Sequence, residues 1–558
     1  MISGWAWLVP LPVLFPLVGA GLTLVAGGRD AVQRSISVIT FVGVLTAAAG
    51  LLVAADGHGP LAVEVGGWPA PMGVVLVVDR LAALMILVSA IVTFGVLLYS
   101  IGQGRSSEDE RDAGAPLPIF HPTLLVLLAG VCTTFVSGDL FHIFVGFEML
   151  LMASFVLLTL GGTADRVRAG VNYVFVSVLS SLLFLTALAM TYAATGTVNL
   201  AQLAQRIPDL PAATQTTLQV LILLGFCIKA AVFPMSGWLP DSYPTAPAPV
   251  TAVFAGLLTK VGVYAIIRTQ TLLFPGGALD DLLLWAALLT MIVGILGAIA
   301  QDDIKRLLSF TLVSHIGYML FGVAVGNEIG LSGAIFYVVH HIIVQTTLFL
   351  VAGLVEWRAG SASLSELGGL AKSSPFIAVL FFIPAMNLAG IPPFSGFLGK
   401  IALLQGGVVN GGALAYLLIG GSVLTSLLTL YAVSRVWSRA FWRRPPAEGG
   451  PDTVTWTIPT TSTSSTSSTS SAWTTSGGGT GADTLTQDPP GIISTGIAAG
   501  LRSVPRGMLA PTTALVIIGI AITVVAGPLY AMTDRAATDL RARTPYLSAV
   551  LTTEEVHR

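Results

Sequence analysis

The chain has 558 residues, of which 54% are hydrophobic and only 10% are charged. About a quarter of the residues of a soluble globular domain are charged, so this composition excludes an ordinary soluble protein. A net charge of −2 provides no basic surface for nucleic acid. The two cysteines, Cys132 and Cys227, lie far apart in apolar runs, which indicates neither a disulfide framework nor a cysteine-based metal site.

Apolar windows of about 20 residues predict an all-α polytopic membrane protein with about fourteen transmembrane helices. The N-terminus lacks the basic region of a signal peptide, so the first apolar run is interpreted as a span. The predicted spans are 5–26, 32–55, 76–100, 120–136, 139–160, 170–194, 216–236, 247–270, 280–300, 306–324, 330–356, 374–409, 413–440 and 509–531. The first three spans, apart from Asp79 and Arg80, are expected to pack against lipid.

Charge asymmetry between the loops predicts how the chain is oriented. The basic residues in the loops after odd-numbered spans are Arg29, Arg34, Arg105, Arg111, Arg166, Arg168, Lys305, Arg306, Arg358, Lys372, Arg435, Arg439, Arg443, Arg444, Arg502 and Arg506. The loops after even-numbered spans hold Arg80, Arg206 and Arg268, and a few more basic residues lie in the C-terminal tail. By the positive-inside rule, the odd loops are cytoplasmic and both termini lie outside the cytoplasm.

Three lysines, Lys229, Lys260 and Lys400, remain inside predicted spans. Lys229 and Lys260 each lie about 12 residues into an apolar segment, or roughly 18 Å, which is close to the middle of a bilayer. A lysine at that depth costs on the order of 2.5–3.5 kcal/mol, so it normally faces a partner or a water-filled cavity. These lysines therefore predict an ion-translocating protein.

Glu148 lies about 9 residues into the fifth predicted span. A nearby cation would keep such a carboxylate ionised, and Lys229 is the next deep charge along the chain. We therefore predict a Glu148–Lys229 pair. The alternative is a glutamate at a helix end near the lipid headgroups.

Two predicted spans are interrupted by proline and glycine. Segment 374–409 is also too long for one span of about 20 residues. The two interruptions align as Pro234-Met-Ser-Gly237-Trp-Leu-Pro-Asp241 and Pro393-Phe-Ser-Gly396-Phe-Leu-Gly-Lys400, and Pro392 precedes the second. The match indicates an internal duplication of five spans each, spans 4–8 and 9–13, which enter the membrane with opposite orientation. Broken helices of this kind line ion sites near the membrane centre.

Histidines occupy the tenth and eleventh predicted spans. His315 lies inside the tenth span, and His340 and His341 are adjacent in the eleventh. Adjacent helical positions point about 100° apart, so one ring can face a channel while the other packs. Histidine can relay protons near neutral pH, which is the role that we favour. A metal site is disfavoured because no third ligand has suitable spacing.

The acidic and basic residues that open the tenth span, Asp302-Asp303-Ile-Lys305-Arg306, are typical of a cytoplasmic helix start. After the thirteenth span, a Ser/Thr-rich segment is predicted to be a disordered linker because it is too polar to bury a core. The predicted organisation is N-terminal spans (1–118), two five-span repeats (119–270 and 271–442), the cytoplasmic linker (443–508), and the last span with its tail (509–558).

Several motifs together resemble the proton-translocating family shared by Mrp-type antiporters and the membrane subunits of complex I. The resemblance covers spans 4 to 13 and is closest to the Mrp branch. It rests on Gly138-Asp-Leu-Phe-His-Ile-Phe-Val-Gly-Phe-Glu148, Lys229 before Pro234, Trp238-Leu-Pro240-Asp241-Ser-Tyr-Pro244, Lys260-Val-Gly-Val-Tyr264, Asp303-Ile-Lys305-Arg306-Leu-Leu-Ser309, Ser314-His-Ile-Gly-Tyr318, Gly66-Gly-Trp68-Pro-Ala-Pro71 and Pro393 to Lys400.

The resemblance implies a role for each of these positions. Glu148 and Lys229 would form an ion pair that controls proton affinity, Lys260 would be the central lysine and Lys400 the terminal one. His340 and His341 would be relay groups, with His315 and Asp241 secondary. The family often has a lysine where this chain has Gln345, so the histidines would carry more of the relay. The long lateral helix of the largest family members is not expected here.

The favoured function is a proton-translocating subunit of a multisubunit Na⁺/H⁺ antiporter in a bacterial-type cell membrane, with no cofactor and with other small hydrophobic subunits as partners. The alternative is a proton-pumping membrane subunit of a quinone oxidoreductase or hydrogenase. No flavin, iron–sulfur or nucleotide motif occurs in the chain, so any redox centre would lie in partner proteins. An inert scaffold would leave three costly buried lysines unexplained.

Overall fold

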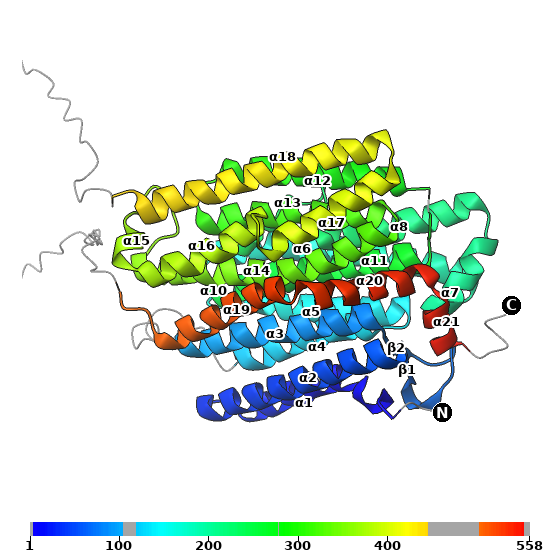
Figure 1. Cartoon of the computed structure of the whole chain (residues 1–558). Coiled ribbons are helices and arrows are strands. Elements are labelled where there is room, and N and C mark those ends of the chain that lie inside the picture. The colour runs from blue at the N-terminus through cyan, green and yellow to red at the C-terminus, as the bar shows by residue number, and fades with distance from the viewer. Residues whose placement is uncertain (1–3, 104–118, 277, 445–501, 552–558) are drawn as a thin grey trace, which may run out of the picture.

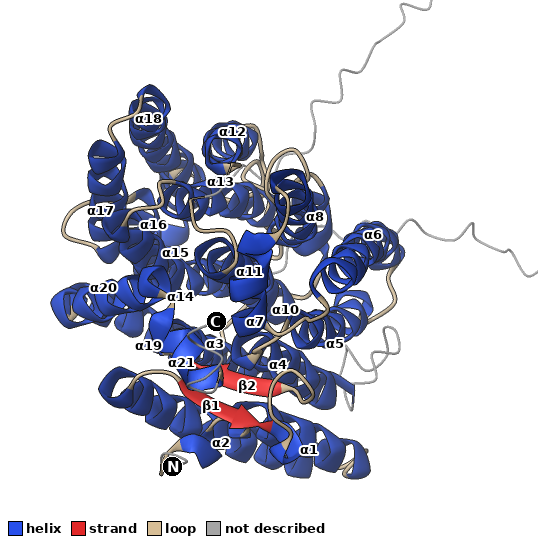
Figure 2. Ribbon diagram, turned by 90° about the vertical axis from the view of Figure 1, so that its right-hand side faces the viewer, coloured by secondary structure: helices blue, strands red, loops and turns tan. Residues whose placement is uncertain are grey.

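The computed structural model describes residues 4–103, 119–276, 278–444 and 502–551. Most of the predicted linker 443–508 and the loop that holds Arg105 and Arg111 lie outside the described residues. The long helices run side by side and form one bundle (Figure 1). The α1 and α2 helices lie at one edge of the bundle, and α17 and α18 lie at the opposite edge (Figures 1 and 2).

The elements up to the first interrupted helix are α1 (Leu11–Val25), α2 (Asp30–His58), β1 (Leu61–Glu64), β2 (Val75–Val78), α3 (Arg80–Gln103), α4 (Phe120–Val136), α5 (Leu140–Thr159), α6 (Ala164–Thr195), α7 (Leu200–Arg206) and α8 (Ala212–Ala230). Those that follow are α9 (Trp238–Ser242), α10 (Ala248–Val253), the π-helical segment η6 (Phe254–Leu258), α11 (Thr259–Leu272), α12 (Asp280–Ile299), α13 (Ile304–Ala324) and α14 (Glu328–Ala359). The last are α15 (Leu370–Ser373), α16 (Pro375–Ala389), α17 (Ser395–Asn410), α18 (Ala413–Val436), α19 (Arg506–Val524), α20 (Ala526–Ala542) and α21 (Thr544–Val550). Short 3₁₀ or π turns occur at Ala6–Leu8, Val65–Gly67, Ile207–Asp209, Tyr243–Thr245 and Trp437–Trp442.

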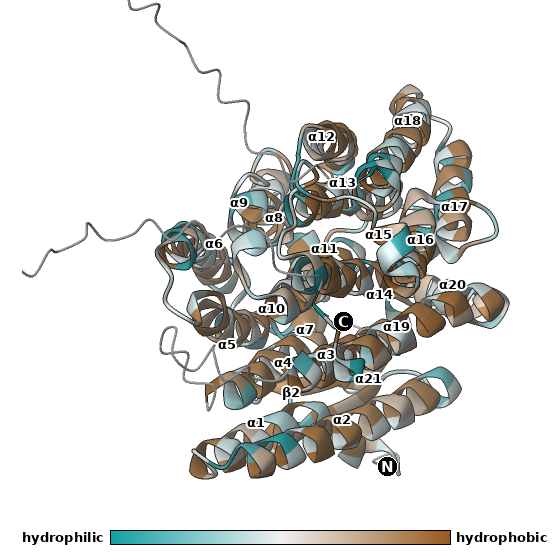
Figure 3. Cartoon of the chain, turned by 90° about the vertical axis from the view of Figure 1, so that its left-hand side faces the viewer, coloured by the Kyte–Doolittle hydropathy of each residue, from teal (hydrophilic) through white to brown (hydrophobic). Residues whose placement is uncertain are grey.

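Length and composition identify the membrane-spanning helices. Among the described residues, 12 helical stretches are long and apolar enough to cross a membrane, and two shorter apolar helices, Phe120–Val136 and Pro375–Ala389, accompany them. Each predicted span overlaps one of these helices, and the apolar colour follows the long helices in Figure 3. The chain is therefore a mostly helical, multi-span membrane protein. Its orientation, its division into domains and the inverted relation of the two five-span units stay predictions.

The helices differ strongly in how much of their surface other helices cover. The most apolar windows of α14 and of the stretch Ala248–Leu272 are wholly buried, and α14 lies near the centre of the end-on view (Figure 2). The corresponding window of α2 is only 33% buried. A helix that is apolar on all sides and covered on all sides belongs to the interior of the bundle. Polar side chains on α11 and α14 are consequently shielded from lipid by other helices.

Two expectations for the N-terminal part are wrong. The third predicted span does not pack mainly against lipid, because the central window of α3 is 78% buried and α2, α14 and α19 pack around it. Nor does a helix begin at residue 76, since Val75–Val78 is a strand paired antiparallel with Leu61–Glu64. A run of valines favours a strand. The side chain of Asp79 then accepts a hydrogen bond from the Ala82 amide at 2.9 Å, at the start of α3.

The C-terminal segment also differs from the prediction. Instead of one span over 509–531, α19 ends at Val524 and a further helix, α20, begins at Ala526. Together α19 and α20 extend along most of the bundle in Figure 1. Because α20 packs against α14 and α3, the part of the predicted tail that the structure describes belongs to the folded protein.

Arg268, which the charge pattern assigns to an external loop, is buried in α11 instead. Its guanidinium donates to both carboxylate oxygens of Asp79, at 2.7 Å each. The rings of Tyr264 and Tyr546 lie 5.4 and 5.1 Å from its central carbon. A bidentate carboxylate and two aromatic rings can compensate an arginine removed from water. This cluster joins α3, α11 and α21.

We predict that Asp79→Asn destabilises the protein strongly. Asparagine can still accept the bond from the Ala82 amide, but Arg268 would keep a buried charge without a counter-charge. Removing one partner of such a pair costs about 3–5 kcal/mol. A thermal unfolding series on the purified protein in detergent measures this loss.

The control is Asp241→Asn, because Asp241 and its partner Arg306 are 61% and 48% exposed, and an exposed pair contributes at most about 1 kcal/mol. Equal melting temperatures for the two variants would contradict the prediction.

Candidate functional site

Glu148 and Lys229 lie at one end of the candidate site, on α5 and α8. They form no direct ion pair within the described part of the chain. The hydroxyl of Ser181, on α6, donates to Oε1 of Glu148 and accepts a hydrogen bond from Nζ of Lys229 at 3.1 Å. The ring of Phe147 lies 4.9 Å from the ammonium. The two charges that the sequence predicts as a pair therefore belong to one hydrogen-bonded unit whose middle member is a serine.

The first helix break follows Lys229 directly. The α8 helix ends at Ala230, and Ala231 has a left-handed backbone with φ of 57°. The indole of Trp238, at the start of α9, donates to the Ile228 carbonyl at 3.2 Å, which also accepts from the Ala231 amide at 3.1 Å. A Cβ on Gly262 would meet the backbone of Ala230. This close approach places the end of α8 against α11, the helix that carries Lys260.

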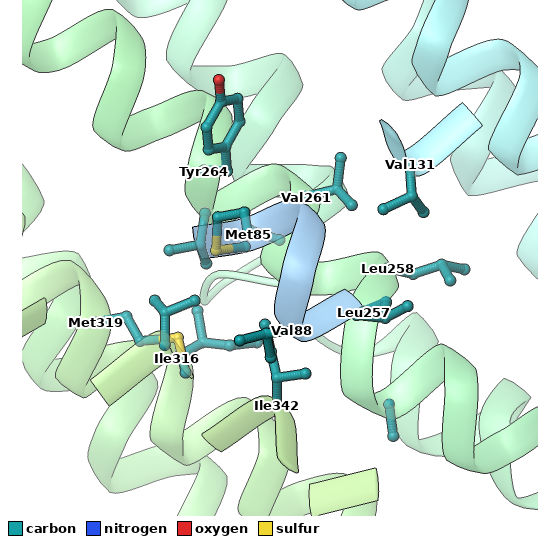
Figure 4. Packing of buried hydrophobic residues seen from close by; sticks show 14 of the residues in the cluster. Met85, Val88, Val131, Leu257, Leu258, Val261, Tyr264, Ile316, Met319 and Ile342 are labelled. Atoms are coloured by element: carbon teal, nitrogen blue, oxygen red, sulfur yellow. The ribbon is translucent and has the colours of Figure 1, made fainter. Parts of the chain in front are cut away.

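Lys260 is fully buried and lies just after the π-helical segment η6. A π-helical segment leaves carbonyl groups without their usual helical partners, and such segments are frequent at functional sites. Nζ of Lys260 donates to the Ala255 carbonyl at 2.6 Å. Apolar side chains from α3, α11, α13 and α14 pack together near the start of α11, as Met85, Val261, Ile316 and Ile342 show in Figure 4. The central lysine thus has a backbone acceptor and lies on a helix that packs in the apolar core.

Three histidines and two tyrosines from α13 and α14 form one buried cluster. Nδ1 of His315 and the Tyr337 hydroxyl are 2.7 Å apart, and the rings of His315 and His341 are centred 5.1 Å apart. His340 lies beside Tyr337, with ring centres 5.4 Å apart, and Tyr318 lies 5.5 Å from His315. The structure therefore brings together His315, His340 and His341, which the sequence places on two separate spans.

Lys400 lies at the other end of the site, beside the second helix break. Its ammonium donates to the carbonyls of Leu388 and Ala389 at 3.3 and 3.0 Å, the last two residues of α16. It also lies 4.9 Å from the ring of Tyr318. A cation at a helix C-terminus is stabilised by the free carbonyls and by the helix dipole. Lys400 is thereby held next to the histidine cluster.

The second break itself contacts the histidine cluster. The side-chain oxygen of Asn387 accepts hydrogen bonds from the Gly396 amide at 2.9 Å and from the Ser395 hydroxyl at 3.3 Å. The Ser395 hydroxyl also lies 3.0 Å from Nδ1 of His340. The break is therefore connected to α14 by side chains. Sequence reasoning missed Asn387, Ser395, Tyr337 and Ser181 because amides and hydroxyls are common inside membrane helices.

Several unpaired polar atoms lie on the helices that carry Lys260 and the histidine cluster. In the described part of the chain, buried atoms without a hydrogen-bond partner include Oγ1 of Thr259, Nε2 of His315 and His340, both ring nitrogens of His341, and Oε1 of Gln345. Buried polar atoms are normally paired, because leaving them unpaired costs free energy. The unpaired histidine nitrogens are free to bind water or protons. The Gln345 amide itself donates to the Leu308 carbonyl at 2.8 Å.

Asp241 lies apart from this line. Its carboxylate is paired with Arg306 at 2.8 Å, and both side chains are largely exposed. Lys305 pairs with Glu356, as expected of a charged helix start at the surface. Among the described residues, no group of three or more His, Cys, Asp and Glu side chains is arranged to hold a metal ion.

Comparisons with known proteins identify the family. A family model described as "NADH:quinone oxidoreductase/Mrp antiporter, TM" matches residues 137–429. The chain belongs to this family. It is 40% identical over 438 residues to a Na(+)/H(+) antiporter subunit of Alkalihalophilus pseudofirmus, covering 78% of this chain and 87% of that protein. The corresponding antiporter subunit of Bacillus subtilis is 38% identical over 439 residues, with the same two coverages.

Solved structures show the same architecture. A chain in the Mrp complex from Dietzia sp. is 31% identical, with a TM-score of 0.81. The match covers 98% of this chain and 100% of that chain. A chain of the archaeal membrane-bound sulfane sulfur reductase has the same TM-score at 24% identity, covering 97% and 99% respectively. At that identity the second likeness shows the fold alone.

We predict that the two aligned glycines of the breaks tolerate substitution differently. A Cβ at Gly396 would collide with the Asn387 carbonyl and lie 3.1 Å from Nε2 of His340, whereas a Cβ at Gly237 meets nothing within 4 Å. Gly237 also has a helical φ of −62°. Gly396→Ala should therefore lower the melting temperature by several degrees, since overpacking typically costs about 1–3 kcal/mol. Gly237→Ala is the matched control and should melt like the unmodified protein. The same melting temperature for both variants would refute this interpretation of the second break.

Proposed function

We propose that the chain is the proton-translocating subunit of a multisubunit monovalent cation/H⁺ antiporter, equivalent to the antiporter subunits that it matches, with Na⁺ as the exchanged cation. The supporting observation is the series of buried cations, Lys229, Lys260 and Lys400, each beside an irregular part of a helix. A stable scaffold does not need such a series, because each buried charge costs several kcal/mol.

The series suggests how a proton would move. Each lysine can exist as an ammonium or as a neutral amine, and a neighbouring charge biases that choice. Between Lys260 and Lys400, His341, His315 and His340 provide rings that can bind and release protons at either nitrogen. Protonation of one lysine would disfavour protonation of the next, so charge would pass along the line in steps. This is transport rather than catalysis, and we propose that the chain needs no cofactor.

The same proposal covers location and partners. We place the protein in a bacterial-type cell membrane, with both termini outside the cytoplasm, as the charge asymmetry of the loops indicates. Other small hydrophobic subunits of the antiporter would pack against it. Exposed apolar residues on α5 and α6, such as Met152 and Phe175, are available to such subunits or to lipid.

The decisive experiment is Na⁺/H⁺ exchange in everted vesicles that contain the whole complex. Lys229→Ala and Lys400→Ala should each reduce exchange at least tenfold, since positioned proton-transfer groups contribute about 10²–10⁴-fold to rates. Lys372→Ala is the control, because Lys372 is exposed and lies outside the line. Full exchange activity in Lys229→Ala vesicles would overturn the proposal.

Purification of the complex in mild detergent tests the assembly. We expect small hydrophobic antiporter subunits to co-purify with the chain in fixed proportion. Iron–sulfur or flavin proteins in that preparation would instead assign the chain to a redox-driven pump. The measurement is the identity and ratio of the co-purifying proteins by mass spectrometry.

A further inference from the structure

Ser181 occupies a special place between the two charges at the first end of the site. Its hydroxyl donates to Glu148 and accepts from Lys229. A hydroxyl can donate one hydrogen bond and accept others at the same time, which neither an ammonium nor a carboxylate can do. The three groups therefore form a continuous donor-to-acceptor chain from Nζ of Lys229 to Oε1 of Glu148.

The hydrogen bonds through Ser181 directly link the two charged groups, Lys229 and Glu148. Ser181 and Lys229 are only 7% and 8% exposed, and the ring of Phe147 covers the ammonium. Within the described residues, the Lys229 ammonium donates its hydrogen bond to the Ser181 hydroxyl. A cavity of about 20 Å³ lies beside Lys229 and is also lined by Ser177 and Tyr173. It has space for about one water.

We propose that the Ser181 hydroxyl relays a proton between Lys229 and Glu148, an inference that rests on the proposed function. In one direction an N–H bond of the Lys229 ammonium breaks and an O–H bond forms on Ser181. The original O–H bond of Ser181 breaks as its proton passes to the Glu148 carboxylate. Lys229 becomes a neutral amine, Glu148 becomes a carboxylic acid, and the serine is unchanged.

The relay lets this charge pair switch states without a large movement. Lys229 is buried and Glu148 is partly buried, so the opposite charges attract one another while the ammonium pays a desolvation penalty. Two neutral groups avoid that penalty, so the ionised and neutral forms can be close in free energy. Transfer through Ser181 interconverts them and leaves Lys229 neutral. A neutral Lys229 no longer repels a charge on Lys260 and can accept the next proton.

The neighbouring serine shows what a purely structural role looks like. Ser180 is also buried on α6, and its hydroxyl donates to the Gly225 carbonyl of α8 at 2.9 Å. That bond ties two helices together and involves neither charge, although Ser180 also lines the small cavity beside Lys229. Ser180 is therefore the matched control for Ser181, with the same residue type on the same buried part of the helix.

The test uses two substitutions of matched shape, Ser181→Thr and Ser181→Val, in the whole complex. Both add the same bulk, but only threonine keeps a hydroxyl. We expect Ser181→Thr and Ser180→Ala to exchange Na⁺ for H⁺ within about twofold of the unmodified complex, and Ser181→Val to be slower by about tenfold or more. The amount of assembled complex is measured for each variant and used to normalise the rates.

A second readout separates transfer from packing. Infrared difference spectra, recorded as the complex turns over, should show a protonated carboxyl band that Glu148→Gln removes. Under the relay, this band persists in Ser181→Thr and is lost in Ser181→Val. If Ser181→Val does not assemble, Ser181→Ala replaces it, with Ser180→Ala beside it, and the same tenfold loss is expected.

Equal rates and equal bands for the threonine and valine variants would overturn the relay. The proposed function would survive that result as long as Lys229→Ala is inactive. If Lys229→Ala also exchanged ions at the full rate, the proposed function would fail along with the relay. The two hypotheses are therefore distinguished in one set of vesicles.

Discussion

The cost of an ammonium group in an apolar interior governs this structure. Each of the three buried lysines donates a hydrogen bond to an acceptor, and each lies close to an interruption of a regular helix. Lys260 donates to a carbonyl of the π-helical segment, and Lys400 donates to the last carbonyls of α16. Lys229 donates instead to the Ser181 hydroxyl on a neighbouring helix. In a regular helix these carbonyls would be occupied by backbone amides, so interrupting the helix creates the acceptors that the charges need.

The same reasoning explains which features the sequence could reveal. A lysine in an apolar run and a proline beside a glycine are rare inside membrane helices, so Lys229, Lys260, Lys400 and both breaks were predictable. Arg268 was not, because its distance from the middle of its span suggested a loop. Its burial depends on Asp79 and Tyr546, which lie far away in sequence, and no local pattern reports such a contact. Ser181 was missed for a related reason, because the role of a serine depends on which charged groups lie beside it, and those groups are on other helices.

The two helix breaks resemble each other in sequence but differ in how tightly they are built. Around Gly396, the backbone carbonyl of Asn387 and the ring of His340 leave no space for a methyl group. Around Gly237 there is open space, and the break is instead held by Trp238 through its bond to Ile228. Two breaks of similar sequence can therefore differ in packing. The tight break lies next to His340, where small displacements would change the distance to a proton-binding ring.

The line of charged groups is not uniform along its length. From His341 to Lys400, ring contacts and the Tyr318 ring connect neighbouring groups directly. Near the start of α11, the helix that carries Lys260, apolar side chains such as Val261, Ile316 and Ile342 pack together in the core (Figure 4). Proton transfer needs a continuous set of donors and acceptors, and these apolar side chains supply none. Unpaired polar atoms of Thr259 and Gln345 lie on α11 and α14, two of the helices that pack there. Under the proposed function, a water held by such atoms would carry a proton past the apolar side chains.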